Sequence, residues 1–368
     1  MLRIDRRSAQ NFDWLLLGLT VVLVGMGLAN LWSATHSGPG GMAPEVRRQL
    51  TALAIGTMAL VAAVAVDYRH LQRLAMPAYV ATLVLLLLTL VLAPVIRGSQ
   101  GWLVFGPVRI QPSELARVGA VLVLARWFAR NPPSQIRQLR ELWKPAALLV
   151  APVTLIVLQR DMGVALLTLL VGTTFVVFVR IPARAWAGVA ALGVAAFAGL
   201  WSFGLRDYQR GRILDFVDPG RDPLSSGYQA IQSTIAVGSG GLFGKGYLEG
   251  TQTQLRFLPT QHTDFVFSVL AEEWGLIGSF VVLGLFIALL LWGLVIARNS
   301  KDNFGAFLAV GCVALLFWPA AINVAMVLGL APVIGVPLPL FSYGGSALLA
   351  NLATIGLLLN VSMRRYMF

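Results

Sequence analysis

The chain has 368 residues, of which 57% are hydrophobic and 12% charged, and its mean hydropathy is +0.77. An apolar fraction this high matches a lipid environment and excludes an ordinary soluble globular protein. The net charge of +12 does not require a nucleic-acid partner, because no basic face with interleaved aromatic residues stands out in the sequence.

Ten apolar runs are long enough to cross a bilayer as helices, so the sequence predicts an all-α, polytopic membrane protein with about ten transmembrane helices. The runs at 114–128 and 144–158 are short and contain polar residues. An even number of spans places both chain ends on the same side of the membrane. In chain order, the runs fall near residues 14–32, 50–66, 77–96, 114–128, 144–158, 162–179, 184–204, 265–297, 304–329 and 341–361.

The distribution of Lys and Arg predicts which side of the membrane holds the two chain ends. With the N-terminus inside, the inner segments contain 16 of the 28 Lys and Arg residues and only five Asp and Glu residues. Lys and Arg in short loops are retained in the cytoplasm. We therefore expect a multi-pass protein with both termini cytoplasmic, and most of the net charge reflects this topology.

We expect residues 1–368 to form a single membrane domain with one large extracytoplasmic loop, residues 205–263. Two segments of this loop, "RDYQRGRILDFVDPGRDP" and "LSSGYQAIQSTIAVGSGG", are typical of short amphipathic helices. The first should stop at Asp218-Pro219-Gly220 and the second at the glycines from Gly238, and both are suited to the plane of the lipid headgroups. The loop is the richest source of outward-facing cations, which are Arg206, Arg210, Arg212, Arg221, Lys245 and Arg256.

Polar side chains that are costly in a membrane gather toward the outer ends of four separate elements. Such residues usually mark functional positions. Tolerated defects would scatter over both leaflets, whereas these share one leaflet. They are Asp264 before the eighth run, Glu114 and Arg117 in "IQPSELARVG", Asp161 in the turn "LQRDMG", and Ser342 and Tyr343 in "PLPLFSYGGSA". Because Glu114 and Arg117 are three residues apart, a simple ion pair within one helix is the alternative interpretation for them.

Asp264, Ser268 and Glu272 follow one another at intervals of four residues, which predicts a stripe on one helix face that turns toward protein or water rather than lipid. Glu272 and Glu273 have a structural alternative, which is pairing with an intramembrane Arg. Asp264 differs from both, because no Lys or Arg lies within four positions of it. This isolation favours a chemical role for Asp264.

Two long stretches resemble the signature of the SEDS family (shape, elongation, division and sporulation), ten-span bacterial polymerases of peptidoglycan glycan strands. They are "YQAIQSTIAVGSGGLFGKGYLEGTQTQLRFLPTQHTDFVFSVLAEEWG" and "VIGVPLPLFSYGGSA". The resemblance extends from "QPSELAR" through the last apolar run, which is most of the chain. The stretches "GSGG", "GKG" and "GTQTQLRFLP" are closer to the elongation member of the family than to the division member.

The resemblance also implies which residues act. Asp264 takes the position of the essential aspartate in the motif "HTDF", and Glu114 and Arg117 take the positions of a polar pair. The family commonly has Lys at the position of Arg117 and Pro at the position of Arg160 before Asp161. Because Arg stays charged, Arg117 fits the role of a fixed cation better than a role in proton transfer.

The chemistry implied by the family joins an acceptor lipid II, through its GlcNAc 4-hydroxyl, to the anomeric carbon of a MurNAc whose leaving group is undecaprenyl pyrophosphate. One carboxylate suffices to take the proton of the hydroxyl, and we assign this role to Asp264. The pyrophosphate needs positive charge, and a bridging divalent cation, Mg²⁺ or Mn²⁺, stays open; no other cofactor is expected. The predicted substrate-binding residues are Glu114, Arg117, Asp161, Arg210, Arg212, Lys245, Ser342 and Tyr343.

The resemblance implies a class B penicillin-binding protein as partner, together with the elongation machinery, since the chain has no Ser-x-x-Lys transpeptidase motif of its own. Two other functions stay open at this point, a lipid II flippase and a noncatalytic scaffold, as do the division and sporulation branches of the same family. A flippase needs a polar path across the full membrane, and the inner halves of the predicted spans offer little polar lining. This asymmetry favours the enzyme.

Overall fold

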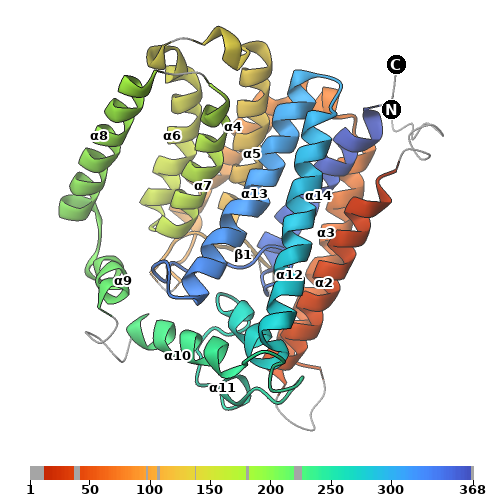
Figure 1. The fold of residues 1–368 in the computed structure, drawn as a ribbon. Helices are drawn as coiled ribbons and strands as arrows, with labels where there is room; N and C mark the ends of the chain where they lie inside the picture. Colours follow the sequence, from red (N-terminus) through yellow and green to blue (C-terminus); the bar gives the residue numbers. More distant parts are fainter. Residues whose placement is uncertain are drawn as a thin grey trace.

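The computed structural model describes residues 12–36, 42–96, 98–105, 108–136, 138–179, 182–218 and 226–365, and most of its secondary structure is helical (Figure 1). Its longer helices are α2 (Trp14–Thr35), α3 (Pro44–Ala65), α4 (Tyr68–Leu92), α5 (Pro112–Arg130), α6 (Trp143–Leu158), α7 (Met162–Thr174), α8 (Ala183–Gly199), α12 (Val266–Arg298), α13 (Asn303–Val327) and α14 (Gly345–Arg364).

The shorter elements connect these helices. Strands β1 (Leu103–Phe105) and β2 (Val108–Ile110) pair antiparallel before α5, with Leu103 opposite Ile110. The remaining short helices are η1 (Pro133–Gln135), η2 (Leu139–Leu142), η3 (Phe175–Phe178), the π-helical η4 (Leu200–Gly204), α9 (Asp207–Val217), α10 (Ser226–Ser239) and α11 (Thr251–Gln254).

Each of the predicted apolar runs lies on one of the longer helices. Within the described residues, seven helical segments are long and apolar enough to cross a membrane: α2, α3, α4, α12, α13, α14 and the segment Leu139–Leu158 that contains α6. Helices α7 and α8 are apolar but shorter, and α5 carries four charged side chains in its sequence. The chain is therefore a mostly helical, multi-pass membrane protein.

Aspartates fix the starts of several helices by accepting hydrogen bonds from backbone N–H groups that the helix itself leaves unpaired. Asp13 caps α2 through the N–H of Leu16, and Asp302 caps α13 through the N–H of Gly305. Asp161 caps α7 in the same way. Pro44 and Pro112 stand in the first turns of α3 and α5, where a missing N–H costs nothing.

Helices α13 and α14 form the centre of the bundle, since most of their residues are buried. Helix α14 packs along α3, and α13 packs against α5 and α12. The contact between α3 and α14 needs glycine at position 356, because a Cβ there would lie 2.7 Å from the carbonyl oxygen of Leu60. Small residues at such contacts let membrane helices approach closely.

The start of α2 and the end of α14 lie at the same end of the bundle. The hydroxyl of Ser362 donates to Asp13 Oδ2 at 2.7 Å, and Nε1 of Trp292 in α12 donates to Asp13 Oδ1 at 3.0 Å. Helices α9, α10 and α11 lie at the opposite end, where α12 begins (Figure 1). The two short helices predicted for this stretch are confirmed as α9 and α10, while Pro219, Gly220 and Arg221 lie outside the described residues.

The predicted stripe on α12 and the predicted start of α14 are wrong, each for a local reason. Helix α12 begins at Val266, so Asp264 precedes the helix and does not belong to the predicted stripe, of which only Ser268 and Glu272 lie on the helix. Helix α14 begins at Gly345 rather than 341, because the preceding residues form a turn in which the hydroxyl of Ser342 accepts from the N–H of Leu338.

Candidate active site

Asp264 lies in the turn that leads into α12, and its backbone is held on both sides. Its N–H donates to the carbonyl of Thr260 at 3.2 Å, and its own carbonyl accepts from Nδ2 of Asn323 in α13 at 2.7 Å. A Cβ placed on Gly335 would lie 3.4 Å from Asp264 Oδ2, so the carboxylate contacts the loop between α13 and α14. The residue is half-buried, so these contacts fix the position of the carboxylate without enclosing it.

The loop between α13 and α14, residues 328–344, connects Asp264 to the start of α7. Asn323 also donates to the carbonyl of Val336 at 2.7 Å, which ties this loop to the turn of Asp264. On the other side, a Cβ on Gly163 would lie 2.8 Å from the carbonyl oxygen of Ile334. Glycine at position 163 therefore allows the first turn of α7 to pack directly against the loop.

Glu114, Arg117 and Asp161 gather where α5 and α7 begin. The guanidinium of Arg117 is paired with Glu114, and both side chains are buried, so the predicted intrahelical ion pair is confirmed. Asp161 Oδ1 accepts from the N–H of Val164 at 3.2 Å and Oδ2 from Nε2 of Gln111 at 3.0 Å. Burial raises the pKa of the Asp161 carboxyl, an effect that the hydrogen bond from Val164 opposes and the charge of Glu114 reinforces.

Arg117 has hydrogen-bonding capacity that the protein leaves unused. Its Nε and Nη1 atoms are buried and have no hydrogen-bond partner in the structure. Buried polar groups almost always have a partner, and those that lack one need an explanation. An anionic group of a substrate would provide one, because a guanidinium binds phosphate and carboxylate oxygens well.

Ser342 and Tyr343 contribute to this end of the bundle in different ways. The hydroxyl of Ser342 is used within its own turn, and its carbonyl accepts from Nε2 of Gln49 at 3.1 Å. The N–H of Tyr343 donates to the carbonyl of His262 at 3.0 Å, and the two rings lie 5.6 Å apart between centroids. Tyr343 therefore contacts the segment of Asp264, whereas Ser342 shapes the turn.

Lys245 lies in an ion pair with Glu272. Its Nζ atom is 2.8 Å from Glu272 Oε1 and 2.7 Å from the hydroxyl of Thr251. Glu272 is fully buried and also accepts from the backbone N–H groups of Gln252 and Thr253. The predicted pairing of Glu272 with an intramembrane Arg is therefore wrong in its cation: the partner is a Lys from the preceding loop.

Arg210 and Arg212 both lie on α9. One Nη atom of Arg210 donates to the carbonyl of Ser202 at 3.2 Å, while its Nε atom is buried without a partner. Arg212 and Asp215 border a cavity of about 400 Å³ between α9, α10 and the residues from Leu328 to Val333, and the other lining residues are mainly apolar. The same loop reaches Gly335 two residues later, beside the Asp264 carboxylate.

The sequence analysis missed Asn323 and Gln111, although both organise this end of the bundle. Asn323 is fully buried in an otherwise apolar helix, and a lone amide at such a position is a recognisable signal of a specific contact. Gln111 immediately precedes the helix of Glu114 and carries the only side-chain amide that donates to Asp161 within the described residues. Among the residues that the structure describes, no three His, Cys, Asp or Glu side chains gather to hold a metal.

Together, the apolar helices and the polar groups clustered at one end define a multi-pass membrane protein with a candidate catalytic centre. Residues 11–367 match the family of cell cycle proteins that comprises FtsW, RodA and SpoVE. The chain therefore belongs to this family, the same one that its motifs indicated.

Individual relatives match over nearly their whole length. Peptidoglycan glycosyltransferase MrdB of Escherichia coli K12 is 41% identical over 96% of this chain and 94% of that protein. Stage V sporulation protein E of Bacillus subtilis is 37% identical over 95% of this chain and 96% of that protein.

Solved structures match equally far. One, described as the structural coordination of polymerization and crosslinking by a peptidoglycan synthase complex, has a TM-score of 0.81 and 34% identity over 97% of this chain and 99% of the matched chain. The rod shape determining protein RodA of Thermus thermophilus has a TM-score of 0.71 and 32% identity over 97% of this chain and 98% of that protein.

Proposed function

We propose that this chain is a peptidoglycan glycosyltransferase that polymerises lipid II into glycan strands during cell-wall elongation and the maintenance of rod shape. The name and 41% identity of MrdB support the activity, and the likeness to RodA supports the elongation branch. The observation that carries the proposal is the position of Asp264. Asn323 fixes its backbone, and its carboxylate lies beside a loop that also lines a mainly apolar cavity.

In the proposed reaction, Asp264 accepts the proton of the GlcNAc 4-hydroxyl of the acceptor as that oxygen attacks the anomeric carbon of the donor MurNAc. The new C–O glycosidic bond forms while the bond from the anomeric carbon to the pyrophosphate oxygen breaks. Undecaprenyl pyrophosphate leaves with the electron pair, and the anomeric configuration inverts. One base suffices, because pyrophosphate is already a good leaving group and needs no proton.

Positive charge near the departing pyrophosphate comes from two places. Arg212, with Asp215, borders a mainly apolar cavity suited to the first isoprenoid units of the donor, and Arg210 lies two residues before it on the same helix. Arg117 has two buried N–H donors without partners and is the fixed cation beside the start of α7. The negative charges of Glu114 and Asp161 act on the same group of residues. Lys245 is already bound to Glu272, which supports a structural role for it.

A divalent cation that bridges the pyrophosphate remains a prediction. The described residues do not gather the three His, Cys, Asp or Glu side chains that would form a protein-built site.

The membrane arrangement extends the proposal. We infer ten spans, with α5, α7 and α8 added to the longer apolar helices, in the bacterial inner membrane with both termini cytoplasmic. Residues 1–368 then form one domain, and residues 205–263 lie outside the cytoplasm as the loop that carries α9 to α11. The likeness to a chain of a peptidoglycan synthase complex supports a cross-linking partner, for which we propose a class B penicillin-binding protein of the elongation machinery.

The test is glycan-strand formation from purified lipid II by the wild type and by Asp264→Asn. The amide keeps the size of the carboxylate but cannot accept the proton, so we expect the rate to fall by about 10² to 10⁴ while lipid II binding and thermal stability are retained. A wild-type rate in the Asn variant would remove Asp264 as the base. Lipid II translocation in vesicles without strand formation would favour the flippase, and a folded wild type that neither forms strands nor translocates lipid II would favour a scaffold.

A further inference from the structure

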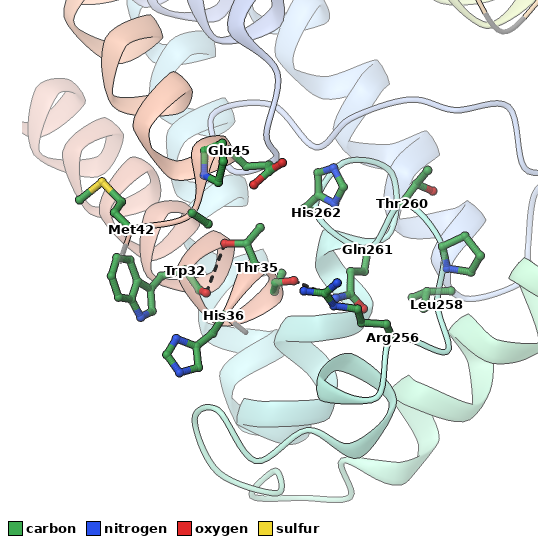
Figure 2. A pocket seen from close by; sticks show the side chains of 14 residues that line it. Trp32, Thr35, His36, Met42, Glu45, Arg256, Leu258, Thr260, Gln261 and His262 are labelled. Carbon is green, nitrogen blue, oxygen red and sulfur yellow. Dashed lines mark hydrogen bonds between the residues drawn. The ribbon is translucent and has the colours of Figure 1, made fainter. Parts of the chain in front are cut away.

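A second cavity, of about 540 Å³, borders the segment that leads to Asp264. One wall comes from the end of α2 with His36 and from residues 42–45 at the start of α3, and the other from the turn of residues 256–262 (Figure 2). The volume falls within the range of about 300–1,000 Å³ that is usual for small-molecule sites. Asp264 follows the last lining residue, His262, by two positions.

The cavity near α9 and this one differ in chemistry. Trp32 and His36 lie on one wall, with ring centroids 6.3 Å apart, and Glu45 lies above them at the start of α3 (Figure 2). Arg256 and His262 lie on the facing wall (Figure 2). Aromatic rings beside positively and negatively charged hydrogen-bonding groups suit a ligand with apolar faces and many hydroxyl and amide groups. They do not suit an isoprenoid chain.

Two polar atoms of the lining turn lack partners. The Oγ1 atom of Thr260 and the Oε1 atom of Gln261 are buried and accept no hydrogen bond, although Nε2 of Gln261 donates to the carbonyl of Ala34 at 2.8 Å. Gln261 is only 6% exposed. Buried acceptors without donors are rare because they cost free energy, and a ligand that brings hydroxyl or amide donors would relieve that cost.

The turn also stores backbone strain at two positions. Arg256 has φ of 57° and Thr260 has φ of 54°, a region that residues with side chains seldom adopt. The surrounding structure holds this strain through the hydrogen bonds of Gln261 to Ala34 and Thr253. Strain of this kind concentrates at ligand sites and active sites. The two strained residues, the two unpartnered acceptors and one wall of the cavity all lie within residues 256–262, shortly before Asp264.

We propose that this cavity is the acceptor saccharide subsite, in which the N-acetylated sugars of the acceptor lie against Trp32 and hydrogen bond to Glu45, Arg256 and Gln261. This rests on the proposed function, since it names the substrate part that each cavity takes. The apolar cavity beside Arg212 receives the lipid-linked donor, and the polar cavity receives the acceptor sugars. Asp264 follows the lining of the polar cavity by two residues, and its carboxylate contacts Gly335, two residues after the lining of the apolar cavity. The acceptor hydroxyl has to meet the donor at this residue.

The experiment measures direct binding of a lipid-free glycan oligomer of alternating N-acetylglucosamine and N-acetylmuramic acid to the purified full chain in detergent, by calorimetry and by saturation-transfer NMR. Trp32→Ala and Glu45→Gln test the cavity. Their matched controls are Trp143→Ala and Glu141→Gln, which change the same residue types. Glu141 lies on η2 and Trp143 directly follows it, and neither residue lines the cavity. Thermal unfolding of each variant shows whether it is folded.

We expect saturable glycan binding that weakens about tenfold or more in both cavity variants, because Glu45→Gln removes the charge from a hydrogen bond and Trp32→Ala removes an aromatic face, and that is unchanged in the controls. Absence of binding to the folded wild type, or equal binding by the cavity variants, would overturn the subsite. Binding of free stem peptide in place of the glycan would also overturn it, because the cavity would then serve the peptide.

Lipid II polymerisation by the same variants separates the subsite from the proposed function. If the folded wild type binds the glycan at this cavity but forms no strands, the glycosyltransferase activity fails and the saccharide site stands. If the wild type polymerises and the cavity variants polymerise with unchanged dependence on lipid II concentration, the subsite fails and the activity stands.

Discussion

The side-chain amide of Asn323 donates hydrogen bonds of 2.7 Å to the backbone carbonyls of both Asp264 and Val336. One buried residue of α13 thereby joins the turn before α12 to the loop before α14. The same loop contacts the Asp264 carboxylate at Gly335 and packs against α7 at Gly163. The position of the proposed base is therefore set by a residue that has no chemical role of its own.

The first prediction follows from this contact. Asn323→Ala removes the donor from two carbonyls and frees the turn of Asp264, so we expect polymerisation to slow by about tenfold to a hundredfold, the range for a catalytic group displaced by about 1 Å. The measurement is the rate of strand formation at a temperature where thermal unfolding shows the variant to be folded. Asn323 acts here as a positioning residue, so lipid II binding should change little.

Asn360 provides the matched control for Asn323. It is another fully buried asparagine, and it donates to backbone carbonyls of Ala63 and Val66 near the start of α4, at the opposite end of the bundle. Asn360→Ala should lose at least as much stability as Asn323→Ala, about 1–3 kcal/mol for each group left unpaired, because its Oδ1 also accepts from the N–H of Tyr68 and from Arg364. It should retain the rate while folded. Equal losses of rate in both variants would mean that Asn323 only stabilises the fold.

The second prediction concerns Gly335, which has φ of 74° and stands against the Asp264 carboxylate. Gly335→Ala adds a methyl group 3.4 Å from Asp264 Oδ2, where the acceptor hydroxyl has to approach. Gly241→Ala is the control, because it shares the positive φ, at 57°, but no atom lies within 4 Å of its added Cβ. Both variants should lose about 1–2 kcal/mol of stability, and only Gly335→Ala should lose polymerisation. A wild-type rate for Gly335→Ala would argue against an open approach to Asp264 from this side.

Much of the fold follows from periodicity and charge alone. Apolar runs marked the longer helices because each must cover its backbone with apolar side chains in lipid. The start of α12 was not visible, since "HTDF" continues directly into apolar residues and the turn depends on hydrogen bonds to Thr260 and Asn323. The break at Gly275, with φ of 65° inside α12, depends on the loop of Gly244 packing against it.

The site was predictable only in part, for a similar reason. Glu114 and Arg117 are three residues apart, so their pairing follows from helix geometry. The contacts of Lys245 with Glu272 and of Gln111 with Asp161 join residues 27 and 50 positions apart, and no local pattern in the sequence fixes such distances. The roles of these residues in substrate binding remain predictions.

The third prediction tests the topology. With Cys312 replaced by Ala, single cysteines at Asn131 and Ser300 should be protected from an impermeant thiol reagent in intact cells, while cysteines at Thr251 and Leu255 should react. Labelling after permeabilisation confirms that each cysteine can react once the reagent reaches it. Reaction at Ser300 from outside would reverse the orientation and move Asp264 to the cytoplasmic side.

The last prediction decides between two roles for Lys245. Glu272 is fully buried and holds the segment from Gln252 to Thr253 through backbone N–H groups at 2.8 and 3.0 Å, while Lys245 Nζ balances its charge at 2.8 Å. Lys245→Met leaves that carboxylate buried without a cation, so we expect a loss of about 3 kcal/mol in the free energy of unfolding. Glu272→Gln combined with Lys245→Met should recover part of the loss, because the amide has no charge to balance, although its single oxygen can replace only one of the two carboxylate oxygens that accept from Gln252 and Thr253. The measurement is thermal unfolding of the single and double variants, with polymerisation rates taken where all are folded. If Lys245→Met keeps its stability but loses polymerisation, and Glu272→Gln does not restore it, Lys245 binds the pyrophosphate and the structural role is wrong.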